Sequence, residues 1–174
     1  MEAQNLIRFA PIEREDLGML QAWRNDPEVR LICREYRLLT MAHQQAWYDD
    51  IVLDPNNVMF KIIDCKDGRP DFEAIGVCGI TFIDWRSRHG LLSIYLGLTG
   101  AISNYYSAVL SELKRVAFDE LNLHCLRAEI YDFDPRKEII LSNGFIETGK
   151  RRQQYYHKGK FWDIIIADVI SGMG

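Results

Sequence analysis

The chain has 174 residues, a formal net charge of −4, 48% hydrophobic residues and 26% charged residues. This composition is typical of one globular domain and excludes a disordered, collagen-like or coiled-coil chain. The acidic balance argues against sequence-independent binding to nucleic acid, and no apolar run approaches the roughly 18 residues that cross a bilayer. The N-terminus lacks the apolar segment of a signal peptide, so we expect one cytoplasmic domain over residues 1–174, without membrane association.

The hydrophobic pattern alternates between strands and helices along the chain. The first half predicts a strand at 6–12, helices at 16–24 and 40–53, and strands at 58–64, 74–83 and 91–97. The second half predicts a long amphipathic helix at 104–120, a strand at 125–131, a short helix at 135–141 and a hairpin of strands at 145–157 and 161–170. Because the last strand is almost entirely apolar, we expect it inside the sheet. This order predicts an α/β fold with a mixed central sheet of about seven strands and about four flanking helices.

The four cysteines and four histidines show no spacing that is typical of a metal site. No Cys-x-x-Cys pair occurs, and disulfides are rare in a chain without an export signal. We therefore expect no bound metal, and we expect the cysteines to be reduced and mostly buried.

Five short strings occur in an order and spacing found in one known family. They are WRNDPEVR at 23–30, IDW at 83–85, FDELNLH at 118–124, NGF at 143–145 and YYHKGKFWD at 155–163. Through these strings the chain resembles the GNAT superfamily of N-acetyltransferases, and within it the ribosomal-protein N-terminal acetyltransferase branch (RimJ/RimL type). The resemblance implies a GNAT fold over nearly the whole chain and acetyl-CoA as the acyl donor. It also implies direct transfer of the acetyl group to an amine.

The resemblance places the acetyl-CoA along the strand that ends near residue 97. Its implied binding groups are the main-chain amides and carbonyls of Leu96, Gly97 and Leu98. We expect that replacing Gly97 by proline removes a backbone donor to the cofactor.

The family also holds the cofactor pyrophosphate at the start of the long helix, with the pattern Arg/Gln-x-x-Gly-x-Gly/Ala. Here the three patterned positions are Ala101, Asn104 and Tyr106, so the glycine-rich loop is lost. The Tyr106 side chain is expected either to fill the space of the pyrophosphate or to turn into the core. Ser103, Asn104 and Ser107 are the remaining candidates for holding a phosphate.

Two side chains that relatives use in catalysis are replaced as well. The glutamate on the cofactor strand corresponds to Leu91, and the tyrosine before the Gly-Phe pair corresponds to Ile140. As catalytic replacements we name Glu129 and Tyr131 on the strand at 125–131, and Tyr156 on the final hairpin. Of Glu129 and Tyr131, only one is expected to face the cleft.

Candidates for contacting the acceptor lie near the mouth of the expected cleft. They are Trp23, Asp84, Trp85, Tyr155 and Asp163. The hairpin segment at 150–160 holds five Lys or Arg and no acidic residue, which is compatible with phosphate contacts and base stacking. We favour an ordinary solvated hairpin, because similar basic residues occur there in ordinary acetyltransferases.

Three functions fit this sequence. The first is an N-acetyltransferase that acts on a small-molecule amine or a protein N-terminus, in a chain that is expected to form a homodimer. The second is a GNAT-fold binding or regulatory protein without catalysis, and the third is a GNAT-fold transferase with a non-CoA or unusual acyl donor. We favour the first, because direct transfer can proceed with positioning and a water-mediated base.

Overall fold

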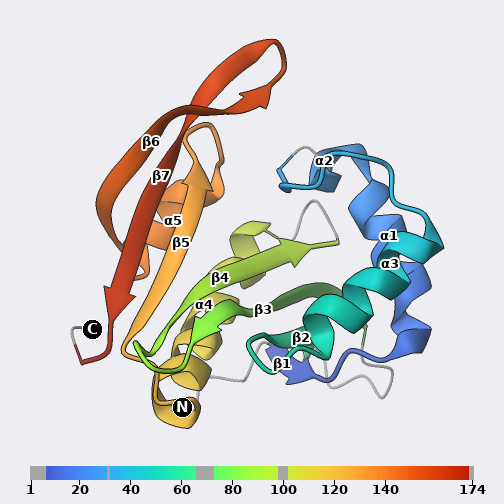
Figure 1. Ribbon diagram of the computed structural model, residues 1–174, viewed down its shortest axis with the longest axis horizontal. Coiled ribbons are helices and arrows are strands. Elements are labelled where there is room, and N and C mark those ends of the chain that lie inside the picture. The colour runs from blue at the N-terminus through green and yellow to red at the C-terminus, as the bar shows by residue number, and fades with distance from the viewer. Residues whose placement is uncertain (1–6, 31, 66–72, 98–101, 173–174) are drawn as a thin grey trace.

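The computed structural model describes residues 7–30, 32–65, 73–97 and 102–172, with the backbone alone at 102–104. Its strands form one seven-stranded sheet in the order β1-β2-β3-β4-β5-β7-β6 (Figure 1). They are β1 Ile7–Ala10, β2 Val58–Asp64, β3 Ala74–Asp84, β4 His89–Leu96, β5 Cys125–Tyr131, β6 Ile146–His157 and β7 Lys160–Ile170. Each neighbouring pair is antiparallel except β4 and β5, which are parallel. The predicted mixed sheet of seven strands is confirmed, and so is the position of β7 inside it.

The described residues hold five α-helices, where about four were predicted. They are α1 Leu17–Asn25, α2 Pro27–Arg30, α3 Met41–Trp47, α4 Ile102–Arg115 and α5 Arg136–Ser142. The additional helix is the single turn of α2, which Pro27 begins, because proline is favourable at the first position of a helix. Thr40 caps α3, since its side-chain oxygen accepts from the His43 main-chain amide at 3.4 Å.

The helices cover the two faces of the sheet separately. Helix α4 packs against one face and contributes Val109, Leu110 and Leu113 to the larger core. Helix α1 packs against the other face, where Leu20 lies in a smaller core. Successive side chains of β4 reach both cores, because neighbouring residues of a strand point to opposite faces.

The sheet opens in its centre, between β4 and β5. The two strands pair only between residues 89–91 of β4 and residues 125–127 of β5. Beyond this point β4 continues beside β3, and β5 continues beside β7. Figure 1 shows the arrows of β4 and β5 diverging upward from their paired end. The fold thus leaves one edge of β4 without a strand partner in the middle of the domain.

Candidate active site

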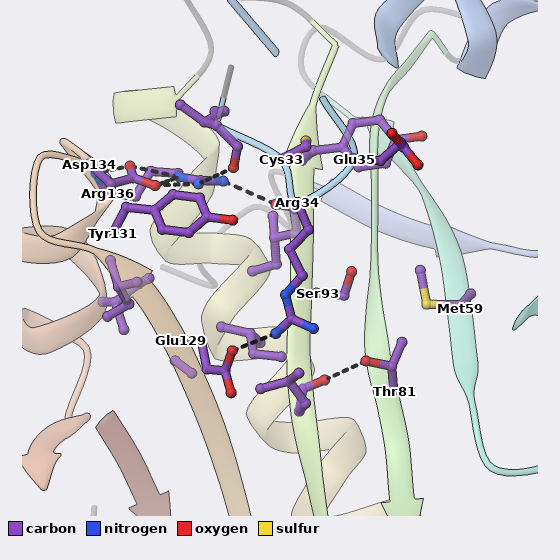
Figure 2. Close-up of a pocket in the computed structure, with 18 of the residues that line it drawn as sticks. Cys33, Arg34, Glu35, Met59, Thr81, Ser93, Glu129, Tyr131, Asp134 and Arg136 are labelled. Atoms are coloured by element: carbon purple, nitrogen blue, oxygen red, sulfur yellow. Dashed lines mark hydrogen bonds and ion pairs between the residues drawn. The ribbon is translucent and has the colours of Figure 1, made fainter. Parts of the chain in front are cut away.

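A cavity of about 370 Å³ lies where β4 and β5 diverge (Figure 2). Its walls come from β4 and β5, from the first turns of α4 and α5, and from the segment between α2 and α3. The catalytic positions that the family resemblance assigned to Leu91 and Ile140 both line it, here with apolar side chains. The cavity therefore coincides with the reaction centre that the resemblance implies, but neither catalytic side chain of the family is present there.

The main-chain groups of β4 alternate between β3 and the cavity. In an antiparallel ladder, every second residue directs its N–H and C=O toward the paired strand. The Gly97 amide donates to the Ile75 carbonyl of β3 at 2.8 Å, so Ile94 and Leu96 direct their groups toward β5. The expectation that Gly97 offers its N–H to a cofactor is corrected, while Leu96 has the expected orientation. Leu98 lies outside the described residues.

Gly97 has a steric role instead. A Cβ atom at this position would lie 2.2 Å from the Trp23 indole, so only glycine lets that ring pack against the end of the strand. Trp23 is therefore held in this contact and does not line the cavity, although it was predicted on the acceptor side.

A buried ion pair bridges the gap between the diverging strands. The Asp134 side chain is 1% exposed and accepts from the Arg136 guanidinium at the start of α5. The same guanidinium donates to the Ile94 carbonyl at 3.2 Å and to the Ile32 carbonyl at 3.4 Å. Arg136 thus ties α5 to β4 and to the segment after α2. Sequence reasoning missed both partners, because Asp134 and Arg136 resemble an ordinary exposed helix start.

Tyr106 lies in the core and also forms part of the cavity wall. It is 3% exposed, and its ring lies 5.9 Å from the guanidinium carbon of Arg136. Burial raises the pKa of Tyr106 to about 12, so its hydroxyl stays protonated. Of the phosphate candidates, Ser107 is exposed, and its hydroxyl oxygen accepts from the Asn143 side-chain Nδ2 at 3.1 Å. The side chains of Ser103 and Asn104 lie outside the described residues.

Glu129 and Tyr131 both line the cavity, which corrects the expectation that only one of them faces it. Residues two apart on a strand lie on the same face. Glu129 accepts from Arg34 at 2.6 Å and from Arg151 at 2.9 Å. Figure 2 shows Arg34 extending from its loop toward Glu129 on β5.

The Tyr131 phenol lines the cavity from β5. Its ring stacks on Tyr155 with 3.7 Å between the centroids, and Figure 2 shows it extending from β5 toward β4. Burial, reinforced by Tyr155, raises the pKa of Tyr131 above its ordinary value. The Tyr155 hydroxyl in turn donates to the Cys33 carbonyl at 3.3 Å. Tyr155, which was predicted to contact the acceptor, therefore packs against the lining residues Tyr131 and Cys33 and does not itself line the cavity.

The other predicted residues lie away from the cavity lining. Tyr156 is 61% exposed and packs edge-on against Phe161. Asp84 and Trp85 are exposed at the end of β3, where Asp84 accepts from the turn amides that follow it. Asp163 accepts from the Gln153 amide at 2.9 Å. The structure does not bring these side chains to the cavity.

The segment between α2 and α3 carries lining residues that no sequence pattern indicated. Cys33, Arg34 and Glu35 all face the cavity from it. Glu35 accepts from the Arg37 guanidinium at 2.6 and 2.8 Å, and these hydrogen bonds lower the pKa of Glu35 to about 2. Short loops of this kind lack periodicity, so their contacts become visible only in the folded chain.

The basic stretch at 150–160 is largely engaged within the chain. Lys150 pairs with Asp163 at 3.4 Å, Arg151 pairs with Glu129, and the Lys160 ammonium lies 4.0 Å from the Trp162 ring centroid. These contacts favour the ordinary hairpin over a nucleic-acid surface. In the described part of the chain, no helix is long and apolar enough to span a membrane, and no three His, Cys, Asp or Glu side chains are grouped to hold a metal ion.

Comparison with solved structures reveals the same fold in spermidine N-acetyltransferases of Vibrio cholerae. A structure in complex with CoA and spermine matches with a TM-score of 0.85 and 16% identity over 97% of each chain. A dodecameric structure in an intermediate state matches with a TM-score of 0.79 and 17% identity, over 95% of this chain and 94% of the other. A spermidine/spermine N-acetyltransferase in complex with manganese ions matches with a TM-score of 0.77 and 16% identity, over 97% of this chain and 95% of the other. A search of curated proteins found no match.

The sequence profile of the acetyltransferase (GNAT) domain matches residues 7–145. Because this match covers most of the chain, the protein belongs to the GNAT acetyltransferase domain family.

Proposed function

We propose that this protein is an N-acetyltransferase that moves an acetyl group from acetyl-CoA to a primary amine. The observation that carries the proposal is the open edge of β4 beside the cavity, where Ile94 and Leu96 direct main-chain groups without a strand partner. Such an edge fits the amide-containing arm of acetyl-CoA, which can hydrogen-bond along a strand as another strand would. When bound, acetyl-CoA supplies the thioester that makes the acetyl group transferable.

The lining residues support a division of roles during transfer. The amine nitrogen forms a bond to the acetyl carbon, the carbon–sulfur bond breaks, and one proton leaves the nitrogen while the thiolate gains one. Tyr131 holds a proton at neutral pH and is our candidate for protonating the thiolate. Glu129 lines the same space and is our candidate for accepting the amine proton, directly or through water.

Two observations favour a second candidate function, a GNAT-fold binding or regulatory protein. The Ile94 carbonyl on the open edge already accepts from Arg136, and the apolar Leu91 and Ile140 occupy the two catalytic positions of the family. An acyl donor that binds along this edge must displace Arg136 from the Ile94 carbonyl or hydrogen-bond to the main-chain groups of Leu96. Because five strings resemble the RimJ/RimL branch, a protein N-terminus stays among the candidate acceptors. The homodimer remains a prediction.

Titration calorimetry with acetyl-CoA, with free CoA as the control, tests the proposal first. We expect binding in the micromolar range, followed by amine-dependent release of CoA in an acceptor screen. Absence of binding at millimolar ligand would exclude the acetyltransferase that we propose. Tight binding without CoA release for any amine would favour the binding or regulatory protein.

A further inference from the structure

The carboxylates that line the cavity are all neutralised by arginines of the same chain. Among the described residues they are Glu35, Glu129 and Asp134. Arg37 holds Glu35 through two hydrogen bonds, Arg34 and Arg151 hold Glu129, and Arg136 holds Asp134. A polycationic acceptor would therefore compete with an arginine for each of these carboxylates.

Arg24, in contrast to these carboxylates, is a charged lining residue without an ion-pair partner among the described residues. It comes from the last turn of α1 and lines the cavity, with its guanidinium carbon 5.3 Å from the Tyr95 ring centroid. Its Nε atom is buried and has no acceptor. No carboxylate of the described residues forms a hydrogen bond or ion pair with Arg24, although its charge contributes to the lowered pKa of Glu35 on the same lining. A buried donor without an acceptor costs free energy, so a ligand with an anionic oxygen gains by binding here.

A third part of the lining is apolar. Trp47 and Ile51 face the cavity from α3 and the turn that follows it, and Met59 and Phe82 face it from β2 and β3. Together with Arg24, this wall offers an apolar surface next to a guanidinium that has no direct carboxylate partner among the described residues.

Phe82 is held in this wall by a strained backbone. It is 58% exposed and has a φ of 52°, a left-handed conformation that is unusual for a bulky residue. Its amide donates to the buried Asn57 side chain at 2.9 Å, and Asn57 donates to Asp54 at 2.8 Å. Strain that is fixed by buried partners often marks a functional position. The exposed Phe82 ring thus adds to the apolar lining of the cavity.

From these three features we infer that the acceptor is an amine that carries a carboxylate and an apolar group, as an apolar α-amino acid does. Its carboxylate pairs with Arg24, and its apolar side chain lies against Trp47, Met59 and Phe82. The inference rests on the proposed function and narrows its substrate class. It separates this chain from a polyamine acetyltransferase, because each carboxylate on the described lining already has an arginine partner with which a polyamine must compete.

Calorimetric titration with three amines tests the site without requiring turnover. The probes are L-phenylalanine, phenethylamine, which lacks only the carboxylate, and spermidine. We expect phenylalanine to bind roughly tenfold or more tightly than phenethylamine, the range of a charge-assisted pair, and spermidine to bind most weakly. Arg24→Gln should bring the ratio between the first two close to one. Arg14→Gln is the matched control, because Arg14 also lies over a tyrosine ring, that of Tyr48, but outside the cavity.

The same amines in a CoA-release assay separate the two proposals. Spermidine that binds or reacts better than phenylalanine would overturn the inference and leave acetyl transfer intact. Phenylalanine binding that depends on Arg24, without release of CoA from acetyl-CoA in the presence of any of the amines, would support the carboxylate-binding site and overturn the acetyltransferase. A phenylalanine-to-phenethylamine ratio near one in the unmodified protein, or no binding of either, would overturn the inference directly.

Discussion

The Arg136 guanidinium donates to the Ile94 carbonyl across the gap where β4 leaves β5. This bond joins the central strand to α5, and the guanidinium remains charged because the buried Asp134 lies beside it. The centre of the domain is therefore held by an ion pair at the point where the backbone ladder is interrupted.

Removal of the cation alone should destabilise the protein strongly. Arg136→Met leaves the Asp134 carboxylate buried without its partner, and we expect a loss of about 3–5 kcal/mol in the free energy of unfolding. The double variant Asp134→Asn with Arg136→Met removes both charges and should lose clearly less. Urea denaturation followed by circular dichroism measures both variants. Equal losses in the single and double variants would show that the pair contributes through packing rather than charge.

Gly97 offers a test of close packing at the end of β4. Gly97→Ala places a Cβ atom against the Trp23 indole, so we expect a loss of roughly 1–3 kcal/mol from overpacking. Gly18 in α1 is the matched control: a Cβ atom there meets nothing within 4 Å, and Gly18→Ala should stabilise by roughly 0.5–1 kcal/mol through helix propensity. A neutral Gly97→Ala would mean that Trp23 can move away at little cost.

The fold could be predicted from the sequence because its signals are local. The apolar stripe of α4, the Thr40 cap and the apolar run of β7 each constrain one element, and their order fixes the architecture. The sequence-based prediction was wrong where it had to state which neighbouring strand a backbone N–H group faces. The amide of Gly97 faces β3 because of the ladder register, and sequence composition does not contain that register.

The site was predictable only for residues on regular elements. Glu129 and Tyr131 were identified because they lie on a recognisable strand, although their shared face was misjudged. Arg24, Arg34 and Arg136 reach the cavity from three different segments, and such long-range convergence has no local pattern. An arginine in a single sequence is most often a solvated surface residue, so the charge pairing of the cavity could be read only from the fold.

Buried tyrosines should make the protein sensitive to alkaline pH. Burial raises the pKa of Tyr95 and Tyr131 above the ordinary value of 10.0 and that of Tyr106 to about 12. The folded state thus holds these protons more tightly than the unfolded state. Stability is unaffected below about pH 10 and is lost as the pH rises through the folded pKa values. Ultraviolet absorbance should therefore show part of the tyrosine ionisation coinciding with unfolding, and complete ionisation in the folded protein near pH 10 would contradict this.

Tyr131 and Tyr156 were both candidates for proton transfer, and the structure distinguishes their surroundings. Tyr131→Phe keeps the stacked ring but removes the hydroxyl that lines the cavity, so we expect kcat to fall by roughly 10²–10⁴-fold with a smaller change in the acceptor KM. Tyr156→Phe alters an exposed side chain outside the cavity and should leave both constants nearly unchanged. Steady-state CoA release, with circular dichroism to confirm folding, provides the comparison. If Tyr156→Phe loses activity and Tyr131→Phe keeps it, the proton must reach the thiolate from the hairpin, and the role that we assign to β5 is wrong.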